Sequence, residues 1–133
     1  MEGHIAEMAH YAGVQDYKLW GGPHRAFHRA LTAHAGERVN DLLGQLFDHS
    51  ERYRRLHIGR GPTAWATAGH REILDAAKTD DRDRTAALLA SHLARTGLEV
   101  SELLDPAYDP AQLRTALVDV GGEVPQKLPA GRS

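Results

Sequence analysis

Hydrophobic positions along the chain recur at spacings of three and four residues, which is the period of an amphipathic α-helix. The clearest example spans residues 37–57, where the repeating positions are Val39, Leu42, Leu43, Leu46, Phe47 and Tyr53. No stretch shows the strict alternation of apolar and polar residues that indicates a half-buried strand. The pattern predicts an all-α protein, built as an antiparallel bundle of four to five helices.

Glycine and proline residues mark the expected ends of these helices. Pro23 follows Trp20-Gly21-Gly22 and is expected to begin a helix, because the N–H that proline lacks has no partner at a first helical position. The remaining boundaries come from the same signals. The helices are predicted at residues 3–12, 23–35, 37–57, 66–78 and 83–104. Residues 105–133 are expected to form a C-terminal extension with one short helix and a flexible tail rich in glycine and proline.

Composition narrows the class of protein. The 133 residues carry 16 Lys and Arg against 18 Asp and Glu, and a formal charge of −2 argues against a surface that coats nucleic acid. No apolar run approaches the roughly 20 residues that cross a bilayer, so a cytoplasmic protein is expected. The chain has nine histidines and no cysteine, which leaves histidine and carboxylate side chains as its strong ligands for a transition metal.

Four of the histidines are predicted to face the interior of the bundle. His24 and His28 are four residues apart and share a helix face, and His70 and His92 lie at helical spacing from apolar neighbours. A buried imidazole needs partners for its nitrogens, and one divalent metal would serve all four. The ordinary alternative is a set of separate, satisfied core histidines. His49 is undecided on this pattern, and the surface or helix-end positions are His4, His10, His34 and His57.

Three segments that carry these histidines have a distinctive sequence: PHRAFHRAL from Pro23, GHREILDA from Gly69 and ASHL from Ala90. In order and spacing they resemble the FCD domain, the all-helical effector-binding domain of many GntR-type transcription regulators. In that family an Asp and three His bind a metal such as zinc or nickel, and a small carboxylate effector often completes the coordination. The resemblance implies that His28, His70 and His92 are the three histidines and that His24 occupies the position of the Asp.

The chain departs from the family pattern in ways that bear on function. His24 in place of Asp gives four neutral ligands, so the ion keeps its double charge and favours an anionic ligand. Gly69 replaces the usual Glu, and Glu37 stands where Asn is frequent. No winged helix-turn-helix precedes the matching segments. Residues 1–104 are therefore interpreted as an N-terminally truncated FCD-like metal-binding domain, which on its own is not expected to bind DNA.

Arginines gather near the end of the 37–57 helix. The ordinary interpretation of the cluster is a solvated helix terminus, and contact with nucleic acid is the weaker alternative. The cluster consists of Arg52, Arg54, Arg55 and Arg60. Arginine also binds carboxylates with two parallel hydrogen bonds. We therefore expect Arg54 and Arg55 to contribute to binding of the anionic ligand.

These observations favour a sensing domain in which a divalent metal, zinc first and nickel, iron or manganese as alternatives, holds a small organic acid. A metalloenzyme on the same scaffold is the alternative, because an ion with open positions activates water or polarises a carbonyl. A purely structural metal is the third hypothesis. Apolar surface left uncovered by a truncated bundle predicts self-association as a homodimer.

Overall fold

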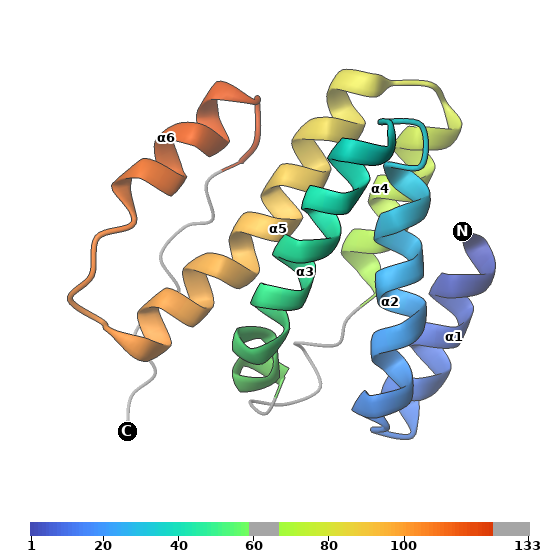
Figure 1. Cartoon of the computed structure of the whole chain (residues 1–133), viewed down its shortest axis with the longest axis horizontal. Helices are drawn as coiled ribbons and strands as arrows, with labels where there is room; N and C mark the ends of the chain where they lie inside the picture. Colours follow the sequence, from blue (N-terminus) through green and yellow to red (C-terminus); the bar gives the residue numbers. More distant parts are fainter. Residues whose placement is uncertain (59–66, 124–133) are drawn as a thin grey trace. The chain divides into compact units, whose positions relative to one another are not determined.

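The computed structural model describes residues 1–58 and 67–123, which form six α-helices and no strand (Figure 1). The helices are α1 (Glu2–Gly13), α2 (Tyr17–Leu31), α3 (Glu37–Ile58), α4 (Ala68–Lys78), α5 (Arg82–Leu104) and α6 (Ala111–Asp119). The all-α prediction is confirmed. Within the described part of the chain, no helix is long and apolar enough to cross a membrane.

The chain divides into two compact units, Met1–Leu74 and Asp75–Ser133. The division falls inside α4, so this one helix belongs to both units. It differs from the functional boundary expected at residue 104, which stays a prediction. The expected flexible tail lies largely in residues 124–133, outside the described part of the chain.

The core of the first unit lies where α1 packs against α2, which runs beside it in Figure 1. Ile5 and Met8 are three residues apart on α1, and both are buried. Trp20 and Phe27 supply the large buried side chains of α2. Met8 and Phe27 have no exposed surface at all, so the interior of this unit is centred on them.

The expected start of a helix at Pro23 is wrong. The helix begins six residues earlier, where the side chain of Asp16 accepts a hydrogen bond from the Leu19 backbone N–H at 3.0 Å, and Pro23 lies inside it. Proline normally forces the preceding residue out of helical conformation, because its ring meets the Cβ of that residue. Gly22 has no Cβ, so the helix continues through the proline. Trp20 is therefore a core residue of the helix and does not belong to a break.

The expected buried stripe of α3 is only partly correct. Its inward side is formed by half-buried residues at helical spacing: Leu43, Phe47, Glu51 and Arg54. Val39, Leu42, Leu46 and Tyr53 are instead 41–56% exposed. Polar Glu51 and Arg54 also lie inward, where both have hydrogen-bond partners, and four of the six residues of the expected stripe face outward.

The second unit contains the last residues of α4, with α5 and α6. Asp81 caps α5 by accepting a hydrogen bond from the Arg84 N–H at 3.1 Å. Val100 of α5 and Leu117 of α6 are buried, and these two helices pack together. After α6, the Glu123 N–H donates to Ser91 Oγ at 2.8 Å, which ties the end of the described chain to α5.

Candidate metal centre

Two histidines of α2 form the first part of the candidate site. His24 and His28 are one helical turn apart, and their side chains are 5% and 3% exposed. Their Nε2 atoms lie 3.2 Å apart. The structure therefore places the two ring nitrogens at hydrogen-bonding distance inside the core, as the four-residue spacing predicted.

His70 joins them from α4, within the same unit. It is 2% exposed, and its ring centre lies 5.1 Å from that of His24 and 5.4 Å from that of His28. One nitrogen from each of the three rings lies within 4.8 Å of the other two. The first unit therefore brings together three of the four histidines predicted to bind a metal.

Aromatic rings hold this cluster from several sides. Trp20 stacks on His24 with 4.4 Å between ring centres and 22° between planes. Phe27 meets the rings of His28 and His70 edge-on at 5.5 and 5.2 Å, and Phe47 of α3 lies 5.3 Å from His28. These contacts restrict the rotation of the imidazoles and keep water away from them, and both effects favour a preorganised site.

A chain of hydrogen bonds leads from the cluster to α3. The Arg54 guanidinium donates through Nη1 to His24 Nδ1 and through Nη2 to Glu51 Oε2. The Tyr17 hydroxyl donates to the other oxygen of Glu51. Arg54 also lies 5.7 Å from the centre of the Trp20 ring, within reach of a cation–π interaction. The guanidinium that faces the histidines is therefore held on three sides.

The ionisation of this chain follows from its contacts. Burial alone would raise the pKa of Glu51, but the Tyr17 hydroxyl and the Arg54 cation outweigh it and hold that pKa below its usual value. Burial and the hydrogen bond to Glu51 raise the pKa of Tyr17. At neutral pH this series of hydrogen-bonded groups thus consists of the neutral Tyr17 phenol, the Glu51 carboxylate and the Arg54 guanidinium, and the charges of Glu51 and Arg54 cancel.

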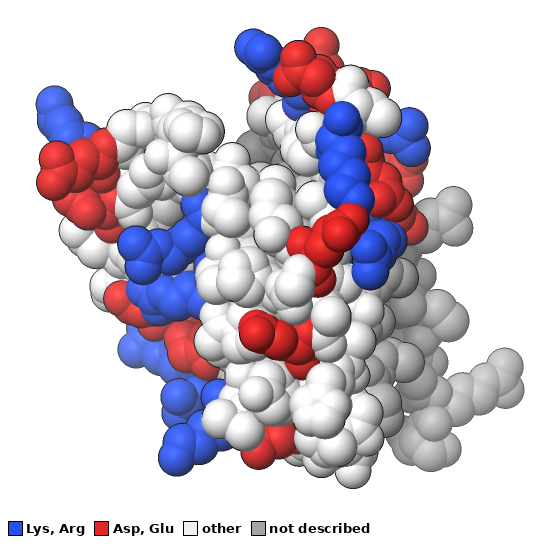
Figure 2. Space-filling view, turned by 90° about the vertical axis from the view of Figure 1, so that its right-hand side faces the viewer, with Lys and Arg blue, Asp and Glu red and all other residues white. Residues whose placement is uncertain are grey.

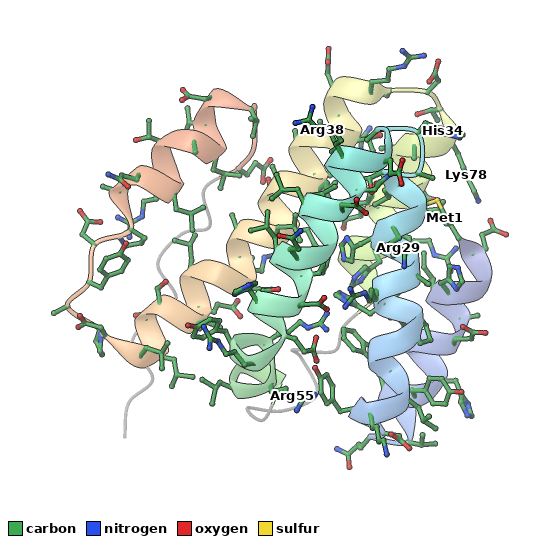
Figure 3. All side chains as sticks on the ribbon, viewed as in Figure 1. Met1, Arg29, His34, Arg38, Arg55 and Lys78 are labelled. Carbon is green, nitrogen blue, oxygen red and sulfur yellow. The ribbon has the colours of Figure 1, made fainter. Side chains whose placement is uncertain are left out.

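The two arginines expected to bind an anion are placed differently. The side chain of Arg54 is 13% exposed and points to His24. Arg55 lies near the C-terminal end of α3 (Figure 3); its side chain is 69% exposed and its Nε is 3.6 Å from Glu51 Oε1. Of these two arginines, Arg54 contacts the histidine cluster within the first unit. Arg60 lies outside the described residues. The ligand-binding roles of Arg54 and Arg55 both stay predictions.

Sequence reasoning missed three residues of the site: Tyr17, Trp20 and Glu51. Trp20 stands four residues before His24, a spacing that would have revealed it had Pro23 not been interpreted as a helix start. Glu51 stands three residues before Arg54, the separation of neighbours on a helix surface. The contact of Tyr17 with Glu51 joins residues 34 positions apart, and no local pattern indicates it.

His92, the fourth predicted ligand, lies on α5 in the second unit and is partly buried. Burial and, to a smaller extent, the Arg95 cation lower its pKa to about 4. Its imidazole is therefore unprotonated at neutral pH, which is the form that binds metals. His49, undecided from the sequence, is exposed on α3 and stands apart from the buried cluster. His10 and His34 are exposed as expected, His4 is half-buried, and the His57 side chain lies outside the described part of the structure.

The donor set fits a borderline transition metal. Neutral imidazoles suit zinc, nickel, copper and iron ions. Two nitrogens on one tetrahedral zinc ion lie about 3.4 Å apart when each Zn–N bond is about 2.0–2.1 Å. The histidine nitrogens of the first unit lie within 4.8 Å of one another, so a shared ion would require the rings to move closer together.

Charged side chains of both signs are present on the face that Figure 2 shows. Basic and acidic side chains lie next to one another there and do not separate into large areas of one sign. Basic and acidic side chains also form ion pairs, as between Arg25 and Asp48 and between Arg114 and Asp109. This agrees with the near-balance of charge in the sequence.

Comparison with known proteins identifies a family. The family model described as the FCD domain matches residues 1–95, which is more than half of the chain and includes all four candidate histidines. No curated protein and no solved structure matches the chain.

Proposed function

Because the chain belongs to the FCD domain family, we propose that it is the metal-dependent sensing domain of a GntR-type transcription regulator and that it responds to a small organic acid. The observation that carries this proposal is the cluster of His24, His28 and His70, three buried imidazoles within one compact unit. A core that only needed filling would favour apolar side chains, because buried polar groups cost free energy unless satisfied.

We propose that the ion is held by the buried histidines. His28 and His70 are the ligands from the first unit, and His92 is the ligand from α5, at the positions of the three family histidines. His24, which the sequence predicted for the fourth position, lies beside His28 and His70 in the first unit. Zinc is the first choice of metal, and nickel, iron or manganese are alternatives.

When bound, the ion supplies a positive charge and a Lewis-acid position for a carboxylate. The residues of the chain do the rest. The aromatic rings of Trp20, Phe27 and Phe47 exclude water and hold the imidazoles. Arg54 brings a second positive group to the cluster, and Glu51 neutralises it until an acid arrives. A low local dielectric strengthens each of these interactions.

We also propose that the chain acts in the cytoplasm as a homodimer. The support is the outward apolar stripe of α3, formed by Val39, Leu42, Leu46 and Tyr53. Contiguous exposed apolar residues are typical of interaction sites. Sedimentation of the pure protein tests this: a dimer is expected, and a monomer at all concentrations contradicts it.

The first experiment is metal analysis of protein prepared without a histidine tag. About one equivalent of a transition metal per chain is expected. His28→Ala and His70→Ala should each lose it, whereas His49→Ala, which alters an exposed histidine of α3, should retain it. A metal-free unaltered protein that also fails to take up added Zn²⁺ contradicts the proposal.

A second experiment separates a sensor from an enzyme. The metal-loaded protein is incubated with a panel of small mono-, di- and tricarboxylic acids, and its melting temperature and the acids themselves are measured. A sensor is expected to gain thermal stability with at least one acid, by mass action, and to leave that acid unchanged. Conversion of the acid would favour the metalloenzyme, and no response to any acid would contradict acid sensing.

A further inference from the structure

The contact between Arg54 and His24 determines which nitrogen of His24 carries hydrogen. A guanidinium has five N–H donors and no acceptor. Arg54 Nη1 therefore donates, and His24 Nδ1 accepts. A neutral imidazole has one donor and one acceptor nitrogen, so the hydrogen of His24 is on Nε2.

The other side of His24 agrees with this assignment. Its Nε2 lies 3.2 Å from Nε2 of His28, a distance at which one nitrogen donates and the other accepts. With hydrogen on His24 Nε2, the lone pair belongs to His28. Arg54 then donates to His24 and His24 donates to His28, so each of the two contacts has one donor and one acceptor.

Arg54 is held in place independently of His24. Glu51 accepts a hydrogen bond from its second terminal nitrogen, and Tyr17 holds Glu51 from the other side. The side chain is largely buried, and a buried guanidinium without its carboxylate would be costly. Arg54 therefore does not readily turn away from His24, and His24 adapts to Arg54.

A metal-binding histidine shows the opposite arrangement. Its ligand nitrogen presents a lone pair to the ion, and its other nitrogen donates to a carboxylate or carbonyl oxygen. If His24 Nε2 bound the ion, the hydrogen would be on Nδ1 and would point at the N–H groups of Arg54. Two donors would then face each other in a buried site, and a charge-assisted hydrogen bond would be lost.

We infer that Arg54 is a positioning residue that keeps hydrogen on Nε2 of His24, so that His24 faces the centre as a hydrogen-bond donor and is not the fourth metal ligand. This inference rests on the proposed function. The ion is then bound by the remaining histidines and keeps an open position, as sites that bind exogenous ligands do. With hydrogen on Nε2, His24 could donate to a carboxylate bound at that position.

The first test measures the tautomer directly. Long-range ¹H–¹⁵N spectra of the full chain, freed of metal with a chelator, distinguish hydrogen on Nδ1 from hydrogen on Nε2. The signals of His24 are identified by their loss in His24→Gln. Hydrogen on Nε2 is expected in the unaltered chain and a mixture in Arg54→Met. Hydrogen on Nδ1 in the unaltered chain would overturn the inference.

The second test uses the affinity for Zn²⁺ alone, measured by competition with a chelator. His24→Gln keeps a side-chain N–H donor and should retain one equivalent of Zn²⁺ with little change in affinity. His28→Gln should lose more than the about 10- to 100-fold that outer residues of metal sites cost. Equal losses in the two variants would overturn the inference; circular dichroism establishes that both are folded.

The third test reverses the role of Arg54. Arg54→Gln offers a carbonyl oxygen that can accept hydrogen from Nδ1, which frees the lone pair of Nε2 for the ion. The affinity for Zn²⁺ should rise by about tenfold or more, and X-ray absorption should count one more nitrogen ligand. Arg54→Met removes the same charge without offering an acceptor and should gain less. Circular dichroism establishes that both Arg54 variants are folded.

An equal gain in Arg54→Met and Arg54→Gln would mean that charge alone is responsible, and would overturn the inference. Failure of the unaltered chain to bind Zn²⁺ or Co²⁺ contradicts the proposed function instead. In that case the tautomer spectrum still decides whether Arg54 controls His24.

Discussion

Replacement of His92 by glutamine is expected to reduce the loss of unfolding free energy that the metal-free protein shows as the pH falls from 6.5 to about 4. The pKa of His92 is lowered from 6.5 to about 4, chiefly by burial. Below pH 6.5 the unfolded chain therefore binds a proton at this residue that the folded chain does not bind until about pH 4. Stability falls as the pH falls through this interval, by roughly 1.4 kcal/mol per pH unit and about 3 kcal/mol in total.

Above pH 6.5 both states are neutral at His92, and the residue makes no contribution to the pH dependence. The assay is urea unfolding in the presence of a chelator at pH values from 7.5 to about 4.5, followed by circular dichroism. The difference between the unaltered protein and His92→Gln isolates His92 from the other buried histidines. Parallel profiles for the two proteins would refute the reasoning.

Four further changes test the first unit, each by urea or thermal unfolding. Phe27→Ala removes a side chain with no exposed surface and should cost about 3–5 kcal/mol; a loss below 1 kcal/mol would mean that Phe27 is not central to this core. Pro23→Ala restores a hydrogen bond inside α2 and should stabilise the protein by about 2 kcal/mol after the gain in unfolded-chain entropy. Gly22→Ala should destabilise the unaltered chain but stabilise Pro23→Ala, and the same sign in both would contradict the explanation given for the continuous helix. Asp16→Ala should cost about 1 kcal/mol through loss of the cap on α2, and no change would argue against that cap.

The all-α fold and the convergence of His24, His28 and His70 were accessible from the sequence, because helical periodicity directly encodes which residues share a face. The start of α2 was not. Proline at a first helical position and proline after a glycine inside a helix look the same locally, and the cap at Asp16 decides between them. The sequence also did not predict which face of α3 is buried. Glu51 and Arg54 lie on the inward face, where their partners Tyr17 and His24 belong to another helix.

The role of Arg54 shows a similar limit. Sequence reasoning placed Arg54 and Arg55 together as candidates to bind an anion, since both lie near the same helix end. The two arginines are consecutive residues of α3, so their side chains point in different directions around the helix axis. The side chain of Arg54 is 13% exposed and that of Arg55 is 69% exposed. Which of the two faces inward depends on the packing of the helix, and the local sequence does not determine it.

The position of α4 has a mechanical consequence. His70 is in the first compact unit, and four residues later the same unbroken helix passes into the second. A helix of eleven residues has no internal joint at which a rotation about its axis could be absorbed. A movement of His70 along or about the axis of α4 is therefore shared by residues 75–78 of the same helix. A single rigid helix thus connects the buried His70 to the chain that leads into α5.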